Sequence, residues 1–177
     1  MFEFPLIGDP IILAIPIQEC GEALVDIKTI NGLAFGDVPE TPLTTNDYTF
    51  MREAVYQKLI NVQKELPTGY RLRLYEAYRN LVVQQDLFEI EKKRVLEVEP
   101  ELSGQALFNR IIEVVSPVIN YDGSKNIPPH NTGAAVDVEI IDQHGVCIDM
   151  GMEAKDWQQV PHELCLTDSS LITEQQR

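Results

Sequence analysis

One histidine and one aspartate in this chain have the types and spacing of a metal site. His130 follows two prolines in a polar turn, and Asp137 lies in a β-branched segment shortly after it. Because alternate side chains of a strand share a face, Asp137 would point away from Val136, Val138 and Ile140, which we predict to face the core. A glycine-containing turn can bring the imidazole back over the carboxylate. An imidazole and a carboxylate that converge suit zinc, which takes nitrogen and oxygen ligands at roughly 2.0 to 2.2 Å.

The same two residues also have simpler explanations. A histidine after two prolines is often an exposed loop residue, and an aspartate in a strand is often paired with a nearby lysine, arginine or turn amide. The spacing of His130 and Asp137 therefore leaves a metal site and a purely structural role both open.

Two segments of the sequence resemble the motifs of a known family. The first has the pattern His-x-x-Gly-x-Ala-x-Asp from His130 to Asp137, and the second ends in Glu76-Ala77-Tyr78-Arg79. The first resembles the signature of the zinc D-Ala-D-Ala metallopeptidases that share a fold with the hedgehog signalling domain, and is most similar to the VanX-type D-alanyl-D-alanine dipeptidases. The second is similar to the family's strand that ends in an acidic residue, a small residue, Tyr and Arg. The resemblance runs from about residue 24 to the C-terminus.

This resemblance implies a zinc-dependent enzyme that hydrolyses the D,D-dipeptide D-alanyl-D-alanine to D-alanine in cell-wall metabolism. It implies that Zn²⁺ is the cofactor, with His130 and Asp137 as two of its ligands. Arg79 would be the catalytic residue over the scissile carbonyl, and Glu76 would face the free amine of the dipeptide. Asp156 corresponds, after a shift of one residue, to a substrate-binding aspartate of the family. A salt bridge between Arg79 and Glu76 is the alternative role for both residues.

The groups that would complete such a site are missing from the recognisable motifs. A catalytic zinc ion needs a third protein ligand, and a carboxylate must take up a proton from water. The family supplies both from a C-terminal Glu-x-x-His, and none follows Asp137 here. The simplest interpretation is a piece of a longer protein, whose companion C-terminal polypeptide completes the site. The alternative makes His162 the third ligand and Glu163 the base, and whether the chain forms a homo-oligomer is left open.

Two rival classes of protein also remain. A non-catalytic protein on the same fold could bind a peptide or a peptidoglycan fragment without cutting it, and the missing ligand and base favour this class if the chain is complete. A structural zinc domain is the third class, and the absence of clustered cysteines counts against it. The cysteines are widely spaced and odd in number, which does not indicate a disulfide framework: Cys20, Cys147 and Cys165.

Charge and hydropathy narrow the range of partners and locations. The chain of 177 residues has a formal net charge of −14, which argues against a nucleic-acid or anionic-membrane partner because both attract basic surfaces. The N-terminus is acidic where a signal peptide would be basic, and no stretch reaches the roughly 20 apolar residues of a membrane span. We therefore expect a soluble, cytoplasmic protein.

The periodicity of apolar residues predicts an α+β fold with a small, mostly antiparallel sheet and helices packed on one side. Residues 1–20 are expected to form an extended N-terminal arm, and residues 21–177 a single D,D-peptidase-like domain that is incomplete at its C-terminus. We predict strands at 21–30, 70–75 and around Asp137, a long loop at 31–47, a hairpin turn at 142–145, and helices at 50–65, 82–98, 103–115 and 166–177.

Overall fold

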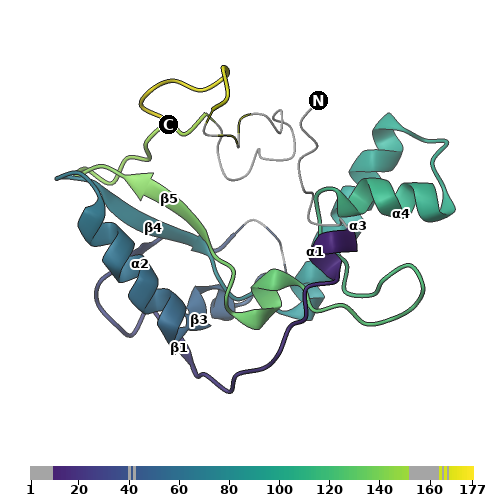
Figure 1. The fold of residues 1–177 in the computed structure, drawn as a ribbon, viewed down its shortest axis with the longest axis horizontal. Helices are drawn as coiled ribbons and strands as arrows, with labels where there is room; N and C mark the ends of the chain where they lie inside the picture. The colour runs from purple at the N-terminus through teal and green to yellow at the C-terminus, as the bar shows by residue number, and fades with distance from the viewer. Residues whose placement is uncertain (1–9, 40, 42, 152–163, 165, 167) are drawn as a thin grey trace.

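A computed structural model describes residues 10–39, 41, 43–151, 164, 166 and 168–177 of the chain. Its described part contains a two-stranded and a three-stranded sheet (Figure 1). In the first, β1 (Leu24–Asp26) pairs antiparallel with β3 (Phe50–Arg52). In the second, β4 (Arg71–Glu76) lies between β2 (Ala34–Phe35), which is parallel to it, and β5 (Asp137–Ile141), which is antiparallel. The predicted α+β class is confirmed.

The main hydrophobic core lies between the sheets and helix α2 (Glu53–Glu65). Leu72 and Leu74 alternate along β4 and are both buried, as expected for one face of a half-covered strand. Val55 and Leu59 of α2 pack against this core. The other buried members come from segments on either side: Ile27, Leu33, Met51 and Ala77. The core therefore fixes the position of β4, whose C-terminal end carries the second motif.

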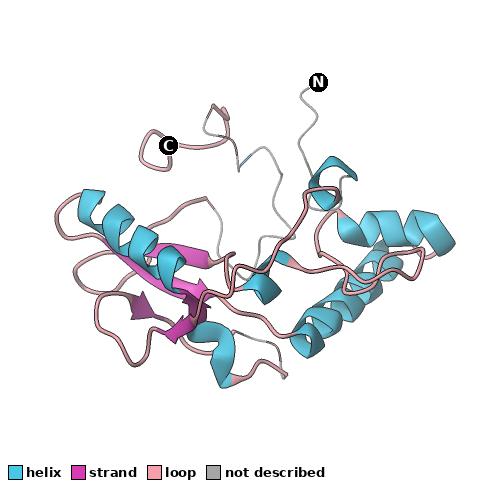
Figure 2. Ribbon diagram, turned by 60° about the horizontal axis from the view of Figure 1, so that its bottom comes forward, coloured by secondary structure: helices cyan, strands magenta, loops and turns pink. Residues whose placement is uncertain are grey.

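Helices α3 (Leu81–Val98) and α4 (Gly104–Ile112) form a second apolar cluster beside the sheets (Figure 2). Its buried members are Phe88, Val95, Ile111 and Val115. Asn80 caps α3, because its side-chain oxygen accepts hydrogen bonds from the amides of Val82 and Val83, both at 3.0 Å. Since α3 begins four residues after Ala77 of the main core, a short link at the end of β4 joins the helices to the sheet.

Strand β5 confirms most of the predicted pattern around Asp137. Val136 and Ile140 pack against the main core, as expected, but Val138 is exposed, contrary to the prediction, although it stands opposite the buried Leu74 of β4. The hairpin turn after the strand is also confirmed. The amide of Asp142 donates to the carbonyl of Val146 at 2.8 Å, and His144 is exposed at the turn.

Three predicted boundaries near the N-terminal half are corrected. The strand predicted at 21–30 shortens to β1, because the Asp26 carboxylate and carbonyl accept bonds from Lys28 and Thr29 and form a turn. Residues 50–52 pair as β3 instead of starting the helix, so α2 begins at Glu53. The loop predicted at 31–47 contains β2 and the start of the 3₁₀ helix η1 (Asn46–Thr49).

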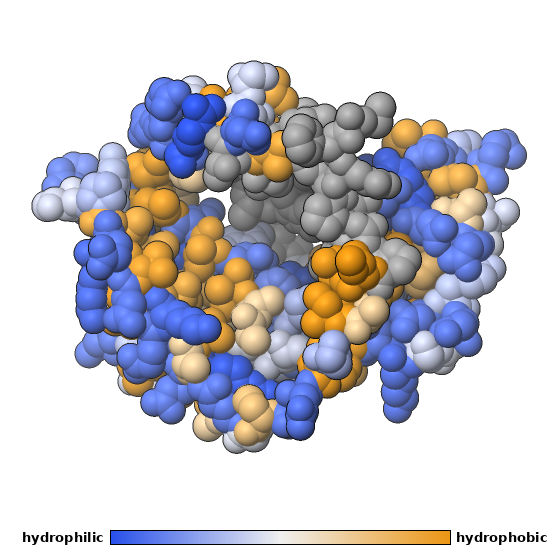
Figure 3. Space-filling model, viewed as in Figure 1, coloured by the Kyte–Doolittle hydropathy of each residue, from blue (hydrophilic) through white to orange (hydrophobic). Residues whose placement is uncertain are grey.

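The two ends of the described chain also differ from expectation. The helix predicted at 166–177 is absent from the described residues there, where the Thr173 carbonyl accepts the amides of Gln176 and Arg177 in a single turn. So short a segment cannot offset the cost of helix nucleation without packing. The predicted extended arm contains a short helix, α1 (Pro10–Leu13), whose neighbourhood is apolar and exposed at Ile11, Ile15 and Ile17 (Figure 3). Among the described helices none is long and apolar enough to cross a membrane.

Candidate active site

A tight turn between α4 and β5 presents His130. The 3₁₀ helix η2 (Pro129–Thr132) carries the histidine and ends at Gly133, whose φ of 71° lies in the left-handed region. Glycine suits this backbone conformation, and a Cβ at Gly133 would in addition require the end of the Leu24 side chain on β1 to shift. The turn then leads directly into β5 and Asp137.

Arg52 at the end of β3 holds this turn in place. Its Nε donates to the carbonyl of Thr132 at 2.8 Å, and its backbone amide donates to the carbonyl of Gly133 at 2.8 Å. Its Nη2 also forms a 2.8 Å ion pair with Glu19. The turn that carries His130 is thus anchored to the end of β3.

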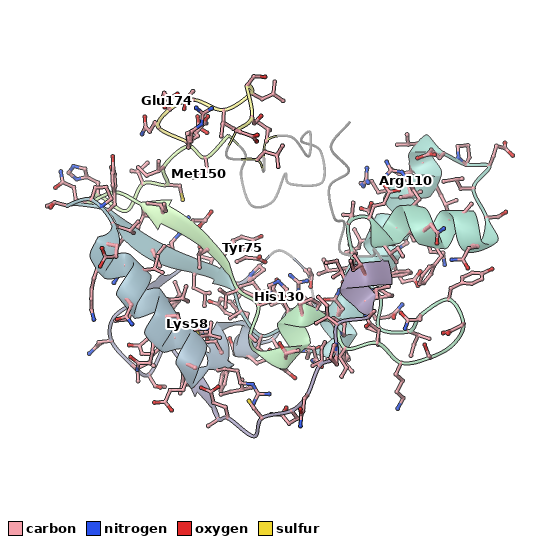
Figure 4. All side chains as sticks on the ribbon, in the orientation of Figure 1. Lys58, Tyr75, Arg110, His130, Met150 and Glu174 are labelled. Atoms are coloured by element: carbon pink, nitrogen blue, oxygen red, sulfur yellow. The ribbon has the colours of Figure 1, made fainter. Side chains whose placement is uncertain are left out.

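The imidazole of His130 is oriented by the end of β4. Its Nδ1 lies 2.8 Å from the carbonyl oxygen of Ala77, and because a carbonyl only accepts, Nδ1 carries the proton. This tautomer leaves the lone pair on Nε2, which lies 3.6 Å from Oδ2 of Asp137. The turn therefore brings the imidazole back over the aspartate, as the sequence predicts, and Figure 4 shows His130 at the end of the sheet.

The His130–Asp137 pair has the donor set and spacing of two zinc ligands. Two ligand atoms of a tetrahedral ion at about 2.1 Å are about 3.4 Å apart, close to the separation of Nε2 and Oδ2. The Asp137 side chain is 48% exposed, so the pair opens towards solvent. Within the described part of the chain, no group of three or more His, Cys, Asp or Glu residues could hold a metal ion. His162, Glu163 and Asp156 lie outside the described residues.

Arg79 joins the second motif to this pair. Its Nε and Nη2 both donate to Oε2 of Glu76, with the Nε bond at 3.0 Å, and Glu76 is only 4% exposed. The predicted alternative, a salt bridge between these two residues, is thus present. The same Nη2 lies 3.8 Å from Oδ2 of Asp137, so the guanidinium also faces the candidate metal ligands. The role of Glu76 towards a substrate amine stays a prediction.

Two hydrogen bonds to main-chain carbonyls hold the two motifs together. The amide of Arg79 donates to the carbonyl of His130 at 3.2 Å, and the side chain of Asn131 donates to the carbonyl of Arg79 at 3.0 Å. The sequence reasoning missed Arg52, Asn131 and Gln84, which contacts the guanidinium of Arg79. The sequence offered one signal for Gln84: a polar residue close after the valines that begin the helix predicted at 82–98.

A shallow, largely apolar depression lies elsewhere, on α3. It contains neither His130 nor Asp137, and its lining residues are Leu43, Leu81, Val82, Gln85, Asp86, Glu89 and Val118. The polar groups at the end of β4 are therefore the stronger candidate for chemistry.

The fold and site define an α+β protein in which a histidine, an aspartate and an arginine meet at the end of a sheet. The chain is similar to a protein of Synechocystis sp. named D-alanyl-D-alanine dipeptidase, with 26% identity over 157 residues. That alignment covers 80% of this chain, and the chain spans 62% of the length of the relative. The resemblance to the D-alanyl-D-alanine dipeptidases is confirmed by this similarity over most of the chain.

The other comparisons add no further relative. No family model matches the chain. No solved structure matches it either, so the hedgehog-like form of the α+β fold stays a prediction.

Proposed function

We propose that this protein acts in the zinc-dependent hydrolysis of D-alanyl-D-alanine to D-alanine in cell-wall metabolism. The observation that carries the proposal is the approach of two side chains, His130 and Arg79, to one oxygen of Asp137. Oδ2 of Asp137 lies 3.6 Å from Nε2 of His130 and 3.8 Å from Nη2 of Arg79. The similarity to a relative named for this dipeptide supports the choice of substrate.

His130 and Asp137 would hold the zinc ion, because Nε2 has a free lone pair and Oδ2 lies at a ligand-to-ligand distance from it. When bound, zinc supplies a Lewis acid and lowers the pKa of a coordinated water to about 7. The Ala77 carbonyl would keep the ring in its metal-binding tautomer, since it accepts the Nδ1 proton.

Arg79 would stabilise the negative charge that develops on the carbonyl oxygen of the scissile bond. Its guanidinium is held in a fixed plane by the two bonds to the buried Glu76, so little reorganisation is needed during the reaction. Loss of one such donor costs roughly 3 kcal/mol of transition-state stabilisation in other enzymes. Glu76 would then face the amine of the dipeptide while it still holds Arg79, with Asp156 as a further substrate contact.

The described residues contain no group of three or more His, Cys, Asp or Glu side chains around one metal position, so His130 and Asp137 lack a third ligand there. A general base is needed as well. We propose that both come from a companion C-terminal polypeptide, with His162 and Glu163 as the alternative within this chain. The rival function is a protein that binds the same dipeptide, or a peptidoglycan fragment, without cleaving it. The two functions differ in whether D-alanine is released.

The experiment that tests the proposal measures D-alanine released from D-alanyl-D-alanine by this chain together with the companion C-terminal polypeptide, with L-alanyl-L-alanine as the control substrate. We expect release from the D,D-dipeptide that stops on chelation of zinc and returns when zinc is restored. Binding of the dipeptide without release at any zinc concentration would favour the non-catalytic rival. Neither binding nor release would contradict both.

A further inference from the structure

A buried glutamine next to the candidate site has no role in the function proposed above. Gln84 lies in the first turn of α3 and is only 2% exposed. Burial of an amide is unfavourable unless its polar atoms form hydrogen bonds, and here both ends do so. Its Oε1 lies 3.1 Å from Nη1 of Arg79, and its Nε2 donates to the carbonyl of Ser116 at 2.7 Å.

The orientation of this amide follows from its two partners. A guanidinium can only donate hydrogen bonds, and a backbone carbonyl can only accept them. The oxygen of Gln84 must therefore face Arg79, and its nitrogen must face Ser116. The reversed amide would place a donor against a donor and an acceptor against an acceptor.

The backbone between Arg79 and Gln84 is also fixed. Asn80 caps the helix with its side chain, and its carbonyl accepts the amide of Gln84 at 3.0 Å. Ser116 is itself buried. It follows Val115 of the second apolar cluster, the one formed by α3 and α4 and called here the α3–α4 cluster. Gln84 is thus held from the helical side, independently of the sheet that carries Glu76.

Three nitrogens of the Arg79 guanidinium consequently have partners on two different parts of the fold. Nε and Nη2 bind Glu76 at the end of β4, and Nη1 binds Gln84 at the start of α3. Both Glu76 bonds go to the single oxygen Oε2, so on their own they would still let the planar guanidinium pivot about that oxygen. The hydrogen bond from Nη1 to Gln84 fixes the orientation of the guanidinium. It therefore also fixes the direction in which Nη2 faces Asp137.

We propose that Gln84 is a positioning residue for Arg79, which ties the oxyanion-stabilising guanidinium to the α3–α4 cluster. This inference rests on the proposed function of Arg79. Gln84 acts through Arg79 and contacts no substrate.

The test compares Gln84→Met, which removes both hydrogen bonds at similar volume, with Gln84→Glu, which keeps an oxygen for Arg79. Gln85→Met is the matched control, because Gln85 is the next residue of the helix, is exposed and bonds only to Glu89 among the contacts seen here. We expect Gln84→Met to lower kcat roughly 10- to 100-fold with KM little changed. Gln84→Glu should retain much more of kcat, and Gln85→Met should equal the wild type. Should Gln84→Met not fold, Gln84→Asn replaces it, since its side chain is one methylene too short to reach Arg79.

A wild-type kcat in Gln84→Met, or equal losses in Gln84→Met and Gln84→Glu that follow their thermal stability, would overturn the proposal. A second readout separates its failure from failure of the proposed function. In ¹⁵N NMR spectra of the arginine side chains, rotation of the Nη1 group of Arg79 should be slow in the wild type and faster in Gln84→Met. If the wild type releases no D-alanine even with the companion C-terminal polypeptide present, the proposed hydrolysis is wrong, and unchanged Arg79 signals in Gln84→Met would separately contradict the positioning role.

Discussion

His130 is bonded to Ala77 through a 2.8 Å hydrogen bond from Nδ1 to the carbonyl oxygen. This bond joins the two sequence motifs, because Ala77 follows β4 within the motif Glu76–Arg79 and His130 begins the motif that leads into β5. It fixes the ring tautomer and leaves Nε2 facing Asp137. The candidate site therefore forms where the residues after β4 contact the η2 turn.

Gly133 should be the least tolerant glycine near the site. Gly133→Ala places a side chain in the left-handed region and against Leu24, so it should lower the free energy of unfolding by about 3 kcal/mol. Gly145→Ala is the matched control, since Gly145 also has a positive φ, of 82°, but open space around it. It should cost only about 1 kcal/mol. Urea unfolding of both variants checks the difference, and equal costs would show that the approach of β1 is not limiting.

Removal of the Arg52 side chain should loosen the turn that carries His130. Arg52→Met loses the bonds to the Thr132 carbonyl and to Glu19, and we expect a loss of about 2 kcal/mol in the free energy of unfolding, together with weaker zinc binding. Arg71→Met, at an exposed arginine of β4, is the control and should change neither quantity appreciably. Unfolding and zinc titrations measure the two effects. Unaltered zinc affinity in Arg52→Met would mean that the turn holds its shape without this anchor.

Substitution of Arg79 should lower kcat more than it weakens substrate binding. Arg79→Lys keeps the charge but cannot bond to Glu76 and Gln84 at once in the planar fork of arginine. We expect kcat for D-alanyl-D-alanine to fall roughly 100-fold, with a smaller change in KM. Arg94→Lys is the control, because Arg94 also pairs with a buried glutamate but lies on α3 among the α3–α4 contacts. Steady-state kinetics decide, and a change confined to KM would assign Arg79 to substrate binding.

The hairpin after β5 should make stability depend on pH. The pKa of Asp142 lies below its ordinary value of 3.8, chiefly because the amide of Val146 donates to its carboxylate. A lowered pKa in the folded state gives stability that is fully present above the unfolded pKa and is lost as the pH falls through the folded pKa. The stability difference between wild type and Asp142→Asn should therefore be constant above about pH 5 and shrink below about pH 4. Urea unfolding at several pH values checks this, and a difference that is independent of pH would contradict it.

The elements that could be predicted are those whose cause is local. The alternation of Leu72 and Leu74 and the Asp-x-x-Gly turn at Asp142 each follow from nearby residues, and the structure contains the corresponding strand and hairpin. The convergence of His130 on Asp137 was also predictable, because the glycine that reverses the chain lies between them.

The elements that could not be predicted depend on distant partners. Residues 50–52 become a strand only because β1 lies beside them, and helical spacing alone assigned them to α2. The anchoring of the His130 turn by Arg52 joins segments far apart in the chain, and no periodicity indicates such a contact. The helix predicted at 166–177 rested on a capping residue near its start, and the described residues there form only turns.

The measurement that tests the account most directly is a calorimetric titration with zinc of the wild type, His130→Ala and His144→Ala. His144 is exposed at the hairpin turn and serves as the control histidine. With the companion C-terminal polypeptide present, the account predicts that the wild type and His144→Ala bind one zinc ion with equal affinity, and that His130→Ala binds none under the same conditions. Equal zinc binding in His130→Ala and the wild type would contradict the assignment of the site.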